Sequence, residues 1–349
     1  MLDSTFKVFP APDAYLAEFR SVDGIRFAGD ALFQGNNRSP NAMLTLWVKP
    51  PVKAVKKEPA PAPKDKKGKA KAEKKAEQAR EDVKPEVTGG EEKPKGERGK
   101  DDKVKVRVLN AQGDTIRTFS TQVDTGMVRI SWNLREDGVR YPSRREAKPD
   151  DDPPSGYEVL PGKYKLLLTY QGKTDSTMVT VHADPRMDIS LANRRAKRVA
   201  FDDFNKIVEK ATAGFDRLQD LKKTIKLVDG ALVNAPDSLK KEISKLGQAV
   251  QDSIASLEKR YMMPEGLKGI QRNPDNVQGK LRRTSGYIDA SEGAPNQAAQ
   301  IMIEQTRKDV VAVLDDINRL VEKDFSEYRK KVEAVQYSLF KDWQPVKLD

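Results

Sequence analysis

Short apolar or alternating segments follow one another in the first half of the chain, each bounded by glycine, proline or other turn residues. They lie at residues 42–49, 104–109, 115–119, 126–134, 163–170 and 176–181. Alternation with a period of two places successive side chains on opposite faces of a β-strand, and several short strands separated by glycine turns are typical of a β-sandwich. We therefore predict an Ig-like β-sandwich over residues 27–183, preceded by an entry segment at residues 1–26.

The apolar spacing changes near residue 184 from every second residue to every third or fourth. Such stripes occupy residues 201–232, 239–261, 277–288 and 310–339. This period is that of an amphipathic helix. Residues 234–238 are expected to end the first helix and to cap the second, and Pro295 to open the last helix near its first turn. Antiparallel helices with matching stripes indicate a helical bundle over residues 184–349.

A strongly charged tract separates the first strand-like segment from the second. Residues 51–103 hold 17 basic and 12 acidic residues and contain no aromatic residue, leucine or isoleucine. Such a composition buries too little apolar surface to offset a backbone ordering cost of about 1–2 kcal/mol per residue. We predict a disordered, lysine-rich insertion in a loop of the sandwich, which costs little because closure entropy grows slowly with length.

Composition excludes several classes of chemistry. The 349 residues carry 64 Lys+Arg against 53 Asp+Glu, a formal charge of +11. The absence of cysteine excludes disulfides, zinc–thiolate sites, iron–sulfur clusters and cysteine nucleophiles, and a single histidine excludes a multi-histidine metal site. No apolar run is long enough to span a membrane, and residues 1–30 show no secretory signal.

An ordered series of motifs in the predicted sandwich resembles a known family region. The motifs lie at residues 27–30, 35–37, 41–44, 106–118, 126–135, 160–164 and 184–186. Together they resemble the C-terminal region of secreted bacterial BNR-repeat or sortilin-like glycosyl hydrolase proteins. The resemblance covers about residues 25–190. It implies a FlgD-like, Ig-type sandwich and a helical tail that follow a β-propeller, and it implies a secreted or cell-envelope location.

The catalytic part of that family does not carry over to this sequence. The Ser-x-Asp-x-Gly repeats of such a propeller do not occur here, and no carboxylate pair stands out as the acid and base of a glycosidase. We therefore assign no catalytic, cofactor-binding or metal-binding residue and expect no cofactor. The partner that the resemblance implies is an upstream β-propeller or another protein.

Two polar features invite a functional interpretation. Asp150, Asp151 and Asp152, with Glu146 and Asp137 nearby in a long polar loop at residues 135–158, could bind Ca²⁺. The spacing of a known calcium loop is missing, so a solvated acidic loop is favoured. His182 ends an apolar strand without a neighbouring ligand or nucleophile, which favours a structural role.

Basic segments could hold an anionic partner. The tract at residues 51–103 could contact an anionic surface, a glycan or nucleic acid. Interspersed acidic residues and the lack of aromatics argue against nucleic acid, so a solvated tether is favoured. Denser basic clusters lie at residues 194–198 and at Arg282 and Arg283. They are equally compatible with ordinary helix surfaces and with anion-binding sites.

Aromatic residues gather in two places. Trp132, Tyr164 and Tyr170 lie in predicted strands, where a core position is favoured over a sugar-binding platform. The end of the last helix carries Phe325, Tyr328, Tyr337, Phe340 and Trp343. This stripe is expected to dock on the sandwich, with a separate partner as the alternative.

The sequence as a whole predicts a non-catalytic accessory module, with the sandwich as a spacer and the helical bundle as a docking face. One alternative is the C-terminal part of a propeller glycosyl hydrolase whose active site lies outside this sequence. The other is an anion or nucleic-acid binder that acts through residues 51–103.

Overall fold

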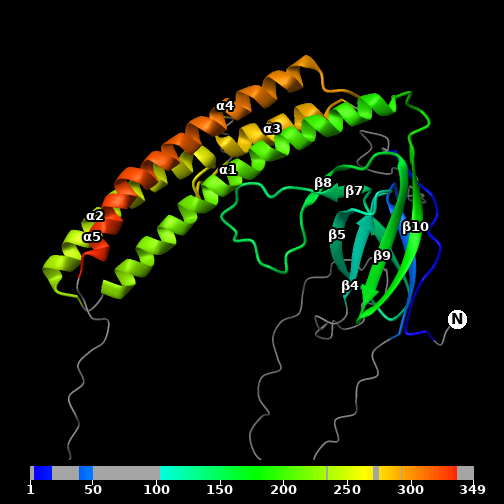
Figure 1. Ribbon diagram of the computed structural model, residues 1–349, viewed down its shortest axis with the longest axis horizontal. Helices are drawn as coiled ribbons and strands as arrows, with labels where there is room; N and C mark the ends of the chain where they lie inside the picture. Colours follow the sequence, from blue (N-terminus) through cyan, green and yellow to red (C-terminus); the bar gives the residue numbers. More distant parts are fainter. Residues whose placement is uncertain are drawn as a thin grey trace, which may run out of the picture.

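The computed structural model describes residues 4–17, 39–49, 103–232, 235–269, 275–291 and 293–335. The chain is of mixed α and β structure, with the strands first and the helices after them. Figure 1 shows the strands gathered beside one end of an elongated group of helices. We call the two parts the β domain and the helical domain. The helical domain therefore extends well beyond the β domain.

The larger sheet of the β domain has five strands in the order β2-β10-β9-β4-β5. Their bounds are Ala14–Leu16 (β2), Lys173–Ala183 (β10), Gly162–Tyr170 (β9), Lys103–Leu109 (β4) and Thr115–Gln122 (β5). Neighbours are antiparallel, except that β2 pairs parallel with the end of β10. The predicted hairpin of β4 and β5 is confirmed, and Gly113 in its turn has φ of 90°, a conformation that favours glycine.

The smaller sheet holds β1 (Phe6–Val8), β3 (Ala42–Val48) and β6 (Gly126–Trp132), in the antiparallel order β1-β3-β6. Inward residues of both sheets form one hydrophobic cluster, which includes Leu44, Leu46, Val106, Leu166 and Leu168, all 0% exposed. Burying each such side chain contributes about 1.5–3 kcal/mol. The two sheets are therefore held together by a shared core.

The aromatic residues of the strands belong to this core, as predicted. Trp132, Tyr164 and Tyr170 are 1%, 7% and 3% exposed. The rings of Trp132 and Tyr164 meet edge to face at 5.4 Å between centroids, and the indole Nε1 donates to the carbonyl of Arg135 at 3.0 Å. Their faces are thus covered by protein, which removes the sugar-platform interpretation.

The chain between β3 and β4 connects the two sheets, because β3 lies in the smaller sheet and β4 in the larger one. Residues 51–102 of the predicted lysine-rich insertion lie outside the described residues, and so do residues 27–38 of the motif series. The predicted entry segment supplies β1 and β2, one edge strand for each sheet.

The polar segment 135–158, predicted to be one long loop, contains a separate antiparallel pair of strands. These are β7 (Arg135–Asp137) and β8 (Ser155–Glu158). We call residues 135–158 the arm. The two short strands were not predicted, whereas residues 144–155 are exposed, as expected for a solvated loop. The arm is anchored from outside, because the guanidinium of Arg117 in β5, 8% exposed, donates to the carbonyls of Pro153 and Pro154 at 3.0 and 2.7 Å.

The predicted change of period near residue 184 is confirmed by the helices that follow. They are α1 (Leu191–Ala231), α2 (Asp237–Tyr261), α3 (Val277–Asp289) and α4 (Gln297–Leu320), the last continued by a π-helical turn at Val321–Phe325 and by α5 (Ser326–Glu333). Ser190 caps α1, its side chain accepting from the backbone N–H of Asn193, as expected for an N-cap serine.

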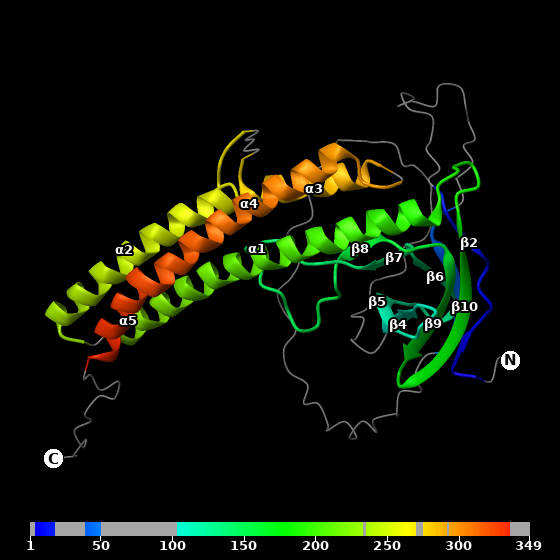
Figure 2. The same ribbon diagram turned by 45° about the horizontal axis from the view of Figure 1, so that its top comes forward.

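The helices form three passes along one axis. Figure 2 shows α1 running outward from the β domain, α2 and α3 returning one after the other, and α4 and α5 running outward again. The antiparallel register of α3 and α4 is marked by Lys280, whose Nζ lies 2.7 Å from Asp309, and by Thr284, whose hydroxyl lies 2.7 Å from that of Thr306. In this antiparallel bundle, α2 and α3 follow one another along the axis and together form the second pass.

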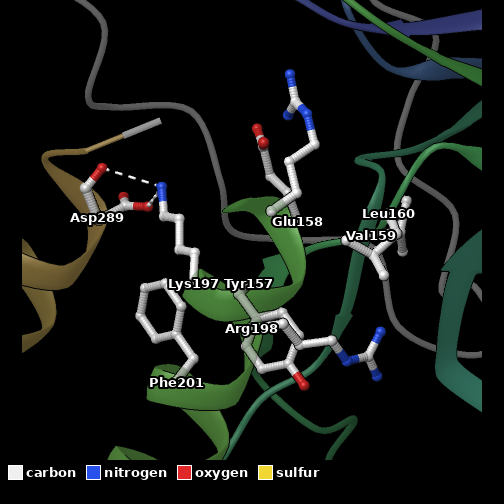
Figure 3. A pocket seen from close by; sticks show the side chains of 9 residues that line it. Tyr157, Glu158, Val159, Leu160, Lys197, Arg198, Phe201 and Asp289 are labelled. Carbon is white, nitrogen blue, oxygen red and sulfur yellow. Dashed lines mark hydrogen bonds and ion pairs between the residues drawn. The ribbon is translucent and has the colours of Figure 1, made fainter. Parts of the chain in front are cut away.

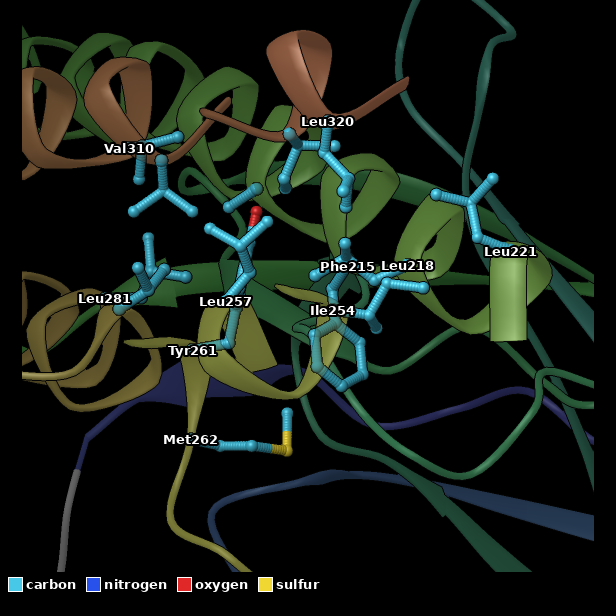
Figure 4. Close-up of a cluster of buried hydrophobic side chains, with 14 of the residues drawn as sticks. Phe215, Leu218, Leu221, Ile254, Leu257, Tyr261, Met262, Leu281, Val310 and Leu320 are labelled. Carbon is cyan, nitrogen blue, oxygen red and sulfur yellow. The ribbon is translucent and has the colours of Figure 1, made fainter. Parts of the chain in front are cut away.

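Apolar stripes of all three passes meet in one core, part of which is drawn in Figure 4. Phe215 and Tyr261 pack with ring centroids 5.2 Å apart. Gly214 lets α1 approach this cluster closely, because a Cβ there would lie 2.5 Å from a methyl group of Leu314 and 2.7 Å from the Tyr261 hydroxyl. This position therefore requires a residue without a side chain.

Three details at the helix ends differ from the predictions. Pro236 occupies the N-cap of α2 without a side-chain hydrogen bond, because its ring offers no acceptor. Pro295 precedes the N-cap of α4, which is Asn296. The last helix ends at Glu333, and residues 336–349, with Tyr337, Phe340 and Trp343, lie outside the described residues. The prediction that this aromatic stripe docks on the sandwich is wrong for Phe325 and Tyr328, which pack in the core of the helical domain.

Candidate functional site

The arm is joined to the helical domain by a buried ion pair. The carboxylate of Glu136 in β7 receives two hydrogen bonds from the guanidinium of Arg198 in α1, at 2.7 and 2.8 Å. Glu136 is 6% exposed, and this burial raises its pKa although Arg198 opposes the shift. A bidentate arginine–carboxylate pair fixes orientation as well as distance. The pair therefore locks the arm to the first turns of α1.

Tyr157 in β8 forms the second contact of this junction. Its hydroxyl donates to Asp202 at 2.6 Å, and its ring stacks on Phe201 with centroids 5.5 Å apart. The guanidinium of Arg198 lies 5.4 Å from the centre of the Tyr157 ring, within the range of a cation–π contact. Burial and the nearby carboxylates raise the pKa of Tyr157, so its hydroxyl stays a donor.

The tip of the arm continues these contacts along the helical domain. Thr212 in α1 donates to the carbonyl of Arg140 at 2.7 Å, and the Arg140 side chain forms an ion pair with Asp216. Lys223 pairs with Glu146 at 2.6 Å. These contacts spread over several turns of α1 and oppose rotation of one domain against the other.

An open groove lies at the end of the helical domain that is remote from the β domain. Its volume is about 700 Å³, and it is bounded by α1 on one side and by the π-helical turn and α5 on the other. The apolar lining consists of Leu221, Val228, Phe325, Tyr328 and Val332. The charged lining carries both signs and consists of Asp216, Arg217, Asp220, Arg329 and Glu333. We call this feature the distal groove.

Tyr328 lines the distal groove and carries a buried polar group. The residue is 2% exposed, and its hydroxyl has no hydrogen-bond partner among the described residues. Burial raises its pKa to about 12, so the hydroxyl keeps its proton. A buried donor without an acceptor costs about 1–3 kcal/mol. The hydroxyl-bearing end of the ring packs against Gly247 of α2, outside the groove lining, so this unpaired hydroxyl belongs to the helical core.

The acidic residues considered as possible Ca²⁺ ligands contact basic and backbone groups of the protein, and Glu146 among them pairs with Lys223 of α1. The carboxylate of Asp151 accepts from Arg145 at 3.0 and 3.1 Å, and Asp152 accepts from the backbone N–H of Ser120 at 2.9 Å. Across the described ranges, no group of three or more His, Asp or Glu side chains is arranged to hold a metal ion. These carboxylates therefore act as anchors for the arm.

His182 lies where β10 pairs with β2. Its Nε2 is 2.8 Å from a carboxylate oxygen of Asp13, and its ring stacks on Tyr15 at 5.1 Å between centroids. Both partners belong to the β2 segment. The contacts join the edge strand to the sheet, as the structural interpretation of His182 predicts.

Some residues of the basic clusters form salt bridges, and others lie at exposed positions. Lys197 pairs with Asp289 at 3.3 Å, Arg198 pairs with Glu136, and Arg195 is exposed. Arg282 and Arg283 are exposed on α3. Sequence reasoning missed the role of Arg198 because Glu136, its partner, lies 62 positions earlier, in a segment predicted to be solvated.

Comparisons with protein-family models and with curated proteins find no match to this sequence. None of the helices in the described part of the chain is long and apolar enough to cross a membrane. The site therefore has to be interpreted from its own geometry.

Proposed function

We propose that this chain is a non-catalytic interaction module of a secreted or envelope-associated bacterial protein. In this proposal an Ig-like sandwich acts as a spacer, and the helical domain presents the distal groove to a protein partner. The observation that carries the proposal is the apolar groove itself, lined by Leu221, Val228, Phe325, Tyr328 and Val332. Exposed apolar surface of this kind marks interaction sites.

The groove favours an amphipathic helix as its occupant. Val228 lies seven residues after Leu221 on α1, and Val332 lies seven residues after Phe325 on the opposite wall. Both walls thus present an apolar residue every two helical turns, the spacing that the apolar face of a helix in a groove matches. Charges of both signs on the rim favour a partner with a mixed polar face.

The arm supports the spacer role. It contacts α1 from Arg198 to Lys223, and the Asp216 that receives Arg140 also lines the distal groove. The groove is therefore held at a set distance and direction from the β domain. A module of this kind serves to hold a partner at a set position relative to the β domain.

Site-specific photo-crosslinking on the full chain tests the proposal. A photoreactive residue at Val332, in the groove, is expected to crosslink an amphipathic helical segment of the partner. The same residue at Leu227, which is 74% exposed and outside the groove lining, is the matched control. Val228→Asp is expected to abolish the crosslink from position 332. Equal crosslinking from both positions, or no effect of Val228→Asp, would overturn the groove as the docking face.

The hydrolase alternative has its own test. If the chain is part of a propeller glycosyl hydrolase, an upstream propeller is encoded in the same reading frame, and the isolated chain still shows no turnover of glycan substrates. Measurable hydrolysis by the isolated chain would contradict a non-catalytic module. Salt-dependent retention on heparin that disappears when residues 51–102 are deleted would instead favour the anion-binding alternative.

A further inference from the structure

A second, smaller cavity lies at the junction of the two domains, and one arginine in its lining has buried nitrogen atoms without a hydrogen-bond partner among the described residues. The cavity has a volume of about 40 Å³ and is bordered by residues 157–160 of the arm and its continuation, by the first turns of α1, and by Asp289 at the end of α3. Figure 3 shows Lys197, Arg198 and Asp289 around it. We call it the junction pocket.

Two of the three basic residues at the junction pocket are neutralised. Lys197 contacts Asp289 twice, through the carboxylate at 3.3 Å and the backbone carbonyl at 3.1 Å. The guanidinium of Arg198 donates two hydrogen bonds to the carboxylate of Glu136. The third, Arg194, is 9% exposed, and its Nε and Nη2 are buried without a hydrogen-bond partner among the described residues.

The carboxylate of Asp184 forms no hydrogen bond with Arg194 Nε or Nη2. Asp184 is held by Arg186, with Nε–Oδ1 at 2.9 Å and Nη2–Oδ2 at 2.5 Å, and it also accepts from the Arg186 backbone N–H at 2.9 Å. Arg194 acts on Asp184 only through its charge. The first turn of α1, where Arg194 lies, contains no acidic residue, and the positive end of the helix dipole adds to the local potential.

The two unpartnered nitrogen atoms of Arg194 determine which kind of hydrogen-bond acceptor could pair with them. Nε and Nη2 form one edge of the guanidinium, and their N–H bonds point the same way. This edge matches two oxygens of a carboxylate, phosphate or sulfate group. A buried cation without such a partner is costly, and a cavity of about 40 Å³ exceeds the space that one water needs.

We propose that the junction pocket binds a small oxyanion, held bidentately by Nε and Nη2 of Arg194. Phe201 and Val159 contribute apolar side chains to the lining of the same pocket, and a charge–charge interaction is stronger in less polar surroundings. The anion would complete the contact between the arm and α1, and its binding would therefore stabilise the junction of the domains.

Thermal unfolding of the full chain with inorganic phosphate, sulfate or acetate, against chloride at equal ionic strength, tests this proposal. The oxyanions are expected to raise the Tm of the wild type in a saturable manner. Arg194→Met is expected to abolish this shift, and Arg195→Met, an exposed neighbour, to retain it. The anion with the largest shift identifies the class, phosphate-like or carboxylate. An absent shift in the wild type, or equal shifts in both variants, would overturn the proposal.

Two further variants keep the test independent of folding. Arg194→Lys retains the charge but loses the fork, so titration calorimetry with phosphate should give at least about tenfold weaker binding. Glu158→Gln removes a negative charge from the pocket lining and is expected to strengthen phosphate binding. If Glu158→Gln instead lowers the Tm in the absence of added anion and leaves phosphate without effect, Glu158 itself serves Arg194 and the proposed site fails.

Discussion

Glu136 in β7 and Arg198 in α1 form a bidentate ion pair that connects the β domain to the helical domain. Removing one partner of a buried pair leaves the other without compensation. Because Arg198 is about one-third exposed, we expect Glu136→Gln to lower the free energy of unfolding by about 1–3 kcal/mol, measured by urea denaturation. Glu209→Gln, at an exposed position of α1, is the control. Equal stability of the two variants would contradict the role of the pair.

Replacing glycine by alanine in the helical domain should lower the free energy of unfolding at one position and raise it at another. Gly214→Ala introduces a Cβ at 2.5 Å from a Leu314 methyl group, and overpacking of this kind costs about 1–3 kcal/mol. Gly286 in α3 faces open space, so Gly286→Ala should stabilise by about 0.5–1 kcal/mol. Urea denaturation of both variants measures the difference. A stabilising Gly214→Ala would show that α1 and α4 pack less closely than described.

Two buried tyrosines offer a matched test of hydrogen bonding. The hydroxyl of Tyr164 donates to the carbonyl of Leu160 at 2.5 Å, whereas that of Tyr261 is buried without a partner among the described residues. Tyr164→Phe should therefore destabilise by about 0.5–1.5 kcal/mol, while Tyr261→Phe should be neutral or stabilising. Thermal unfolding monitored by circular dichroism compares them. The opposite order would mean that Tyr261 has a partner in solution.

Asp184 should make stability depend on pH in the acidic range. Hydrogen bonds from Arg186 lower the pKa of Asp184 to about 2. A carboxyl whose pKa is lower in the folded state stabilises the fold above its unfolded pKa of about 3.9, and this contribution is lost as the pH falls through the folded value. The stability difference between wild type and Asp184→Asn should therefore be constant from pH 7 to 5 and shrink between pH 4 and 2. A difference that does not change with pH would contradict the assignment.

The regular elements could be predicted because each depends on a local pattern. The stripe from Phe201 to Leu232 predicts α1, and the alternation at residues 104–109 predicts β4, since both record which face is buried. The sequence also favoured core positions for Trp132 and Tyr164, where the structure places them. In each of these cases the spacing of apolar residues close together in sequence indicates which side chains are buried.

The junction could not be predicted because its partners are distant in sequence and polar. Arg135, Glu136 and Asp137 have the composition of a solvated loop, and Glu136 is buried only because Arg198 meets it from α1. Arg194 likewise lines the junction pocket together with residues 157–160, and no local pattern in the sequence indicates this. Tyr328 was noted for its aromatic neighbours, yet its unpartnered hydroxyl depends on the packing of three helical passes.

The central claim is that the arm holds the distal groove in a fixed position relative to the β domain. Electron–electron distance measurement between spin labels at Met127→Cys in β6 and Leu227→Cys in α1 tests it directly, because both sites are exposed and the chain has no native cysteine. The account predicts one narrow distance distribution, which broadens in Glu136→Gln. A broad distribution in the wild-type background, or one that Glu136→Gln leaves unchanged, would contradict it.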